Sequence, residues 1–186
     1  MRVVLLYVLL PLILLLIAFY WWAQGPSVDK ELLHQEITIS PDVTQGEDSA
    51  FSVMTYNLGY LSGMTNNLAV KPSIDLFDAN LEAARKLIKK WDPDLVGFQE
   101  IDFASNRSYN RNQLDSLSDG FAYAVQSVNW NKKYVPFPYW PPKVHFGRML
   151  SGQAVLSKFP LIQSQRLVLP GPEAAPFYYK AFYLDR

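Results

Sequence analysis

Two short stretches, FSVMTYNL at Phe51–Leu58 and DLVGFQE at Asp94–Glu100, decide the fold that we predict for this chain. Both are rich in apolar and β-branched residues, which is typical of buried β-strands. Between them, apolar residues recur at helical spacing from a cap at Asp75 or Asp78 to about Trp91. The order strand, helix, strand predicts parallel pairing, so both strands should end at the same edge of one sheet.

Polar side chains stand at the end of each of these strands. Asn57 ends the first strand and Glu100 ends the second. If the strands are parallel neighbours, an amide and a carboxylate converge on one spot. Mg²⁺ needs few protein oxygens, because it keeps its waters for a phosphate substrate. Taken alone, the pair is also consistent with a turn-forming Asn and a solvent-exposed Glu.

Further elements are predicted beyond the second strand. A short helix is expected at Asn110–Ser118. More strands are expected at Phe121–Val128, Gln153–Ser157, Leu161–Leu169 and Phe177–Leu184. The mixture of strands and helices places the domain in the α/β class.

The N-terminus carries an uncharged apolar run from Val3 to Trp22. A bilayer core about 30 Å thick needs about 20 helical residues, so residues 3–22 are expected to cross a lipid bilayer. Tyr20, Trp21 and Trp22 suit the headgroup layer at one end. A cleaved signal peptide and a buried soluble helix are the alternatives, but a signal peptide should be shorter and end in small residues.

The domain limits follow from this run. Residues 1–23 are expected to be an uncleaved transmembrane anchor, and residues 24–49 a linker with one short strand at Glu36–Ser40. Residues 50–186 then form the soluble domain. Arg2 precedes the run and Asp29 follows it, which favours a cytoplasmic N-terminus and a domain on the periplasmic or extracellular side.

Composition excludes several classes of protein. The 17 basic and 17 acidic residues cancel, so no excess positive charge is available for a general electrostatic grip on nucleic acid. The chain has no cysteine, which excludes disulfides, thiol nucleophiles, zinc ribbons and iron–sulfur clusters. Apolar residues make up 49% of the chain, and at this level a disordered chain is not expected.

Three strings together, SVMTYNLGY, DPDLVGFQEID and SGQAVLSKFPL, resemble the endonuclease/exonuclease/phosphatase superfamily, in the family order. The resemblance covers Phe51 to about Arg186 and implies a DNase I-like layered α/β sandwich. It also implies that Glu100 binds the catalytic Mg²⁺, with Mn²⁺ as a substitute, and that Asn57 lies beside metal and phosphate. In the third string, Gly152 allows a tight backbone.

Two arginines near these strings are candidates for substrate contacts. Arg107 lies in the loop after the second string, and Arg148 lies just before the third. A guanidinium suits a phosphate because it can donate two parallel hydrogen bonds. The alternative for Arg107 is an ordinary surface arginine.

The sequence also departs from the family pattern. The later family motifs, with a catalytic His paired to Asp, an Asp-x-Asn string and a closing Asp-His, do not follow Leu161. The two histidines, His34 and His145, do not stand in the family's catalytic position. We therefore expect an incomplete sandwich whose C-terminal half is missing, the N-terminal fragment of a longer hydrolase. Alone, it should be prone to aggregation and without phosphodiesterase activity.

The resulting expectation is a membrane-anchored, Mg²⁺-dependent phosphoesterase or phosphodiesterase. Its substrate is a phosphate ester, with nucleic acid, phospholipid and inositol phosphate left open, and no protein partner is predicted. The alternative is a non-catalytic interaction module or relic that keeps the fold. A third possibility concerns the aromatic and proline-rich run Trp130–Pro142, which either binds lipid headgroups or sugars or tucks its rings into the core.

Overall fold

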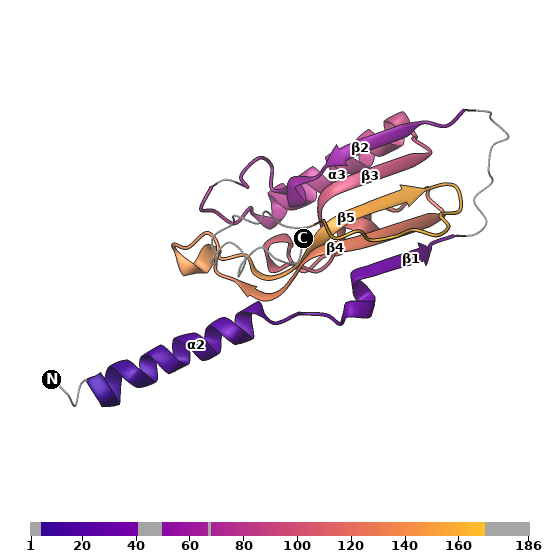
Figure 1. The fold of residues 1–186 in the computed structure, drawn as a ribbon. Coiled ribbons are helices and arrows are strands. Elements are labelled where there is room, and N and C mark those ends of the chain that lie inside the picture. Colours follow the sequence, from indigo (N-terminus) through magenta and orange to yellow (C-terminus); the bar gives the residue numbers. More distant parts are fainter. Residues whose placement is uncertain (1–4, 41–49, 67, 170–186) are drawn as a thin grey trace.

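The computed structural model describes residues 5–40, 50–66 and 68–169. In them, one sheet of five strands has the order β1-β4-β5-β3-β2 (Figure 1). The strands are β1 (His34–Thr38), β2 (Val53–Asn57), β3 (Leu95–Asp102), β4 (Tyr123–Val135) and β5 (Gly147–Ser157). The helices are α2 (Leu10–Gln24), α3 (Ile74–Trp91) and α4 (Gln113–Leu117). The predicted α/β class is confirmed, and the sheet is consistent with the DNase I-like fold.

Strands β2 and β3 pair in parallel, as predicted, with Asn57 opposite Gln99. The remaining pairs, β3 with β5, β5 with β4 and β4 with β1, are antiparallel. Parallel neighbours need a crossover, and helix α3 provides it. The carboxyl ends of β2 and β3 therefore meet at one edge of the sheet.

Helix α3 buries a regular stripe of Phe77, Leu81, Ala84 and Ile88 in the core of the domain. The predicted cap is wrong, because Ser73 caps the helix and its hydroxyl accepts from the Leu76 N–H at 3.2 Å. Ser73 is the residue with extended backbone before the first turn, while both predicted caps, Asp75 and Asp78, already lie inside the helix.

The segment expected to be a linker contributes to the sheet. Strand β1 pairs with β4 from His34 to Thr38 and forms one edge. The strand expected at Leu161–Leu169 is wrong, because residues 161–169 form no ladder. That stretch binds the sheet through other contacts. The Ser164 hydroxyl contacts Glu36, and the Arg166 Nε donates to the Val128 carbonyl at 3.0 Å. The strand expected at residues 177–184 lies outside the described residues.

Helix α2 projects away from the sheet at one end of the molecule (Figure 1). A π-helical turn at Leu5–Leu9 precedes α2 and continues it. Among the described residues, the stretch Leu6–Gln24 that they form is the one that is long and apolar enough to cross a membrane. Its side chains are mostly exposed. A helix that is apolar on all sides and unburied is typical of a membrane span.

The last turn of α2 packs against the end of β4. The rings of Phe19 and Trp22 lie 5.7 and 6.4 Å from the ring of Tyr134. Just beyond the helix, the buried amide of Asn131 accepts from the Ser27 N–H at 2.7 Å and donates to the Val28 carbonyl at 2.9 Å. The helix end is therefore attached to the domain rather than joined to it by a free linker.

Candidate functional site

The side chains of Asn57 and Glu100 meet at the shared edge of β2 and β3. The Asn57 Nδ2 donates to the Glu100 Oε1 at 3.2 Å. The Asn57 Oδ1 accepts from the Gly59 N–H at 2.9 Å, which orients the amide. The expected proximity of these two side chains is confirmed, because parallel strands bring their carboxyl ends together.

A β-bulge determines where Glu100 points. In the ladder between β3 and β5, Gln99 pairs with Gln153 and Ile101 pairs with Gly152, so Glu100 is an extra residue. Its backbone has φ of +51°, in the left-handed region. This conformation costs a non-glycine residue on the order of 1–3 kcal/mol, and such strain concentrates at functional sites. The bulge turns Glu100 out of the ladder toward the same pocket as Gln99.

A second bulge lies directly across β5. Val128 pairs with Gly152 and Trp130 pairs with Ser151, so Asn129 is the extra residue of β4. The two bulges thus flank Gly152 on both sides. A Cβ at this position would lie 2.0 Å from the Ser127 carbonyl oxygen, so only glycine fits. The tight backbone expected at Gly152 is confirmed.

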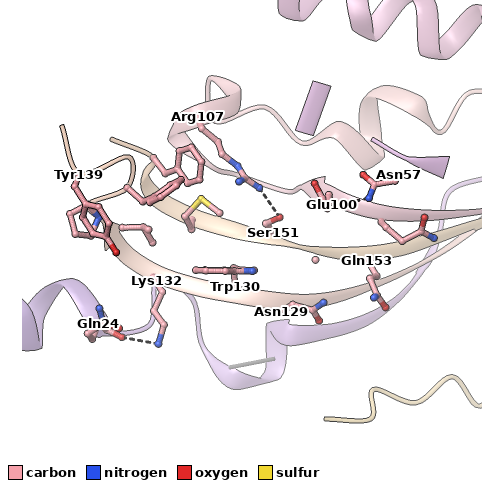
Figure 2. Close-up of a pocket in the computed structure, with 17 residues that line it drawn as sticks. Gln24, Asn57, Glu100, Arg107, Asn129, Trp130, Lys132, Tyr139, Ser151 and Gln153 are labelled. Atoms are coloured by element: carbon pink, nitrogen blue, oxygen red, sulfur yellow. Dashed lines mark hydrogen bonds between the residues drawn. The ribbon is translucent and has the colours of Figure 1, made fainter. Parts of the chain in front are cut away.

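These residues line a pocket of about 370 Å³ (Figure 2). Phe98 and Ala154 lie in the core with α3, so the neighbouring Gln99 and Gln153 place the pocket on the opposite face of the sheet. One part is polar, and its side chains include Asn57, Glu100, Asn129 and Gln153. The other part is aromatic, and its side chains include Trp130, Phe137, Tyr139 and Phe146. A concave site with few convergent polar groups and an apolar wall is typical of a small-ligand site.

Arg107 also lines the pocket and is held by a buried ion pair. Its Nε and Nη2 donate to the two carboxylate oxygens of Asp102 at 3.0 and 2.9 Å. The Asp102 side chain is 0% exposed and the Arg107 side chain 11%. The guanidinium carbon lies 3.6 Å from the centre of the Tyr60 ring. Arg107 is therefore not an ordinary surface arginine.

The Tyr60 ring beneath this guanidinium remains neutral at physiological pH. Burial raises the pKa of its phenol above the ordinary value of 10.0, and the nearby Arg107 charge opposes that rise. A neutral, buried ring offers a stable face for a cation. Tyr60 thus helps to keep Arg107 at the edge of the pocket.

Arg148, the other candidate arginine, does not line this pocket. Successive residues of a strand point to opposite faces. Met149 and Ser151 face the pocket, so Arg148 lies on the other face with Leu150, a member of the core. Arg148 therefore does not lie in the pocket with Glu100, and its contact with substrate stays a prediction.

Neither histidine lines the pocket. His34 contacts the hydroxyls of Ser127 and Ser164 at 2.9 and 3.0 Å. His145 contacts the Tyr134 hydroxyl at 2.7 Å. Both histidines form hydrogen bonds that join one segment of the chain to another.

The oxygen donors of the pocket suit a hard divalent cation. Glu100 supplies a carboxylate, and Asn57, Asn129 and Gln153 supply amide oxygens. Such donors fit Mg²⁺ or Mn²⁺ ions that keep several waters. In residues 5–40, 50–66 and 68–169, no group of three or more His, Asp or Glu side chains is placed to bind a metal ion.

Sequence reasoning missed Asn129, Ser151 and Gln153 as pocket residues. The SGQAVLSKFPL string contains two of them, and the aromatic run begins beside the third. Alternation along a strand would have grouped Ser151 with Gln153, but the facing bulge at Asn129 depends on a pairing between distant segments.

One family model matches the chain, over residues 54–183, and it describes the Endonuclease/Exonuclease/phosphatase family. No curated protein and no solved structure matches the chain. The matched region contains α3, β3, β4, β5 and all of β2 except Val53. It includes both residues of the strand-end pair, Asn57 and Glu100. Because this match covers more than half of the chain, the protein belongs to the endonuclease/exonuclease/phosphatase family.

Proposed function

We propose that this protein is a membrane-anchored, Mg²⁺-dependent phosphoesterase whose site is the pocket at Glu100. Members of its family are generally hydrolases that act on phosphoester bonds. The observation that carries the proposal is the contact between Asn57 and Glu100 at 3.2 Å, at the pocket end of two parallel strands.

Glu100 would hold the cation. The bulge exposes its carboxylate in the pocket, and the strained backbone there supports a functional role. When bound, Mg²⁺ would stabilise negative charge on the phosphate and the leaving group. Mn²⁺ would serve in its place, since the donors are all oxygens.

Asn57 and Arg107 would orient the phosphate. The Asn57 amide is fixed by its contacts with Gly59 and Glu100. The Arg107 guanidinium donates to Asp102 through two N–H groups and to the Ser151 hydroxyl at 3.3 Å. It has five N–H groups, so further donors remain at the pocket wall. The Arg107 side chain is already held in place before the substrate binds, so little free energy is spent on ordering it.

Helix α2 would anchor the domain in a membrane. Its length and exposed apolar surface support a single span. The positive Arg2 before the span and Asp29 after it favour an N-terminus in the cytoplasm and a domain on the periplasmic or extracellular side.

Metal binding by the protein in detergent micelles tests the proposal. In titration calorimetry with Mg²⁺ and then Mn²⁺, we expect saturable binding that Glu100→Gln removes, because the substitution deletes the charge and keeps the shape. Glu82→Gln is the control, because Glu82 is an exposed carboxylate of α3, paired on the surface with Arg85. Ion binding is measured instead of turnover. Among the described residues no histidine lines the pocket to act as a general base, and the chain alone is expected to have no phosphodiesterase activity.

Inorganic phosphate then tests the second half of the site. We expect Mg²⁺ to strengthen phosphate binding in the wild-type protein and not in Glu100→Gln. If the wild-type protein binds neither ion, the proposal is wrong and the non-catalytic interaction module is the better explanation.

A further inference from the structure

An exposed aromatic loop lies next to the pocket and follows β4. In it, Tyr139 and Trp140 are 73% and 76% exposed, and Phe137 is 39% exposed. Large aromatic side chains gathered in one exposed loop are unusual for a surface that faces only water. The expectation that the rings of this run tuck into the core is therefore wrong for Tyr139 and Trp140.

The loop is tied to the end of α2 through two side chains. The ring of Tyr134 packs against Phe19 and Trp22 of the helix. The Tyr134 hydroxyl contacts His145 Nδ1 at 2.7 Å, and His145 Nε2 approaches the Tyr139 carbonyl at 3.4 Å. The loop therefore lies near the last turn of α2, and Tyr139 and Gln24 line the same pocket (Figure 2). The helix carries Phe19 and Trp22 at this end.

The charge around the loop suits a lipid surface. Lys133 precedes the loop and Lys143 follows it, and both are exposed. No Asp or Glu occurs between Asp119 and Glu173. Exposed aromatic rings flanked by lysines are typical of segments that rest in the headgroup layer of a membrane, where phosphate groups attract the cations.

We propose that the loop Phe137–Trp140 inserts into the interface of the same bilayer that α2 spans. The inference rests on the proposed anchoring by α2 and adds a second membrane contact. Phe137 and Tyr139 line the pocket, as does Gln24 at the end of α2 (Figure 2). The bilayer contact would therefore hold the mouth of the pocket at the level of the headgroups, within reach of phosphate groups on lipids.

Depth-dependent fluorescence quenching tests the inference. The chain has no cysteine, so Trp140→Cys provides a single site for a small fluorophore in the full-length chain reconstituted into vesicles. We expect lipids with a bromine or spin label near the headgroup to quench this fluorophore strongly, and iodide in the water to quench it weakly. Trp91→Cys is the matched control, because Trp91 is also an exposed tryptophan, 64% accessible, at the far end of α3.

A third label, at Leu14→Cys in the middle of α2, separates the two proposals. Lipids with a bromine near the end of the acyl chain reach the depth of this label. If they do not quench the label at 14, the anchoring itself is wrong. If the label at 14 is quenched but the label at 140 behaves like the label at 91, open to iodide and insensitive to lipid, then the loop does not enter the interface. A label at 140 that is shielded from both quenchers points to a protein partner and also overturns the inference.

Discussion

The buried ion pair between Arg107 and Asp102 allows a sharp prediction about stability. Arg107→Leu would leave a carboxylate that is 0% exposed without the partner that now donates two hydrogen bonds to it. Removing one partner of a buried pair costs about 3–5 kcal/mol. The lost contact between the guanidinium and the Tyr60 ring acts in the same direction. Since a domain is stable by about 5–15 kcal/mol, the loss is a large share of the total.

Urea unfolding in detergent micelles, followed by tryptophan fluorescence, measures this loss. With a slope of about 2 kcal/mol per molar urea, the midpoint should fall by about 2 M. Arg85→Leu is the control, because its pair with Glu82 is exposed on both sides and contributes less than about 1 kcal/mol.

A double variant isolates the reason for the loss. Arg107→Leu with Asp102→Leu removes both charges, and replacing both partners of a buried pair by apolar side chains is often nearly neutral. We therefore expect the double variant to be more stable than Arg107→Leu. The reasoning is refuted if Arg107→Leu costs no more than Arg85→Leu, or if the double variant is the least stable of all.

Three further predictions concern the bulges and the start of β3. Glu100→Gly should be more stable than Glu100→Ala by about 1 kcal/mol in urea, because alanine keeps the left-handed strain and glycine does not; equal midpoints would contradict that strain. Gly152→Ala should cost about 1–3 kcal/mol and lower the melting temperature, because the added methyl meets the Ser127 carbonyl; an unchanged melting temperature would refute the close approach. Hydrogen bonds from the N–H and hydroxyl of Ser52 hold the pKa of Asp94 below 3.8. This carboxylate therefore contributes stability that is present above about pH 4 and lost as the pH falls through the lowered pKa. In Asp94→Asn, the free energy of unfolding should fall less steeply as the pH is lowered below about 4. If it falls as steeply as in the wild-type protein, Asp94 does not have this role.

Some of the site could be predicted because it depends on local pattern. The apolar runs at β2 and β3 and the helical spacing between them imply parallel strands, and the parallel pairing brings the ends of both strands to one sheet edge. The bulge at Glu100 then turns its carboxylate toward Asn57. The three strings predicted the family. The uncharged run at the N-terminus predicted a helix of membrane length, since hydropathy and length are properties of consecutive residues.

Other parts of the site depend on which distant segments become neighbours. The bulges at Glu100 and Asn129 arise from the register of three strands around Gly152, and the face that Arg148 occupies follows from the same register. A one-residue change in register would reverse these faces. The bulges that shift the register arise between strands that lie far apart in the chain.

The amino-acid sequence by itself determined the α/β class, the family and the meeting of an amide with a carboxylate at one sheet edge. The tertiary structure alone decided that Arg107 is held by a buried Asp102, and that the end of α2 lies beside the aromatic loop through Tyr134. The physical reason is that secondary structure follows the period of nearby side chains. Burial and charge pairing instead depend on contacts between residues far apart in the chain, which exist only once the sheet has formed.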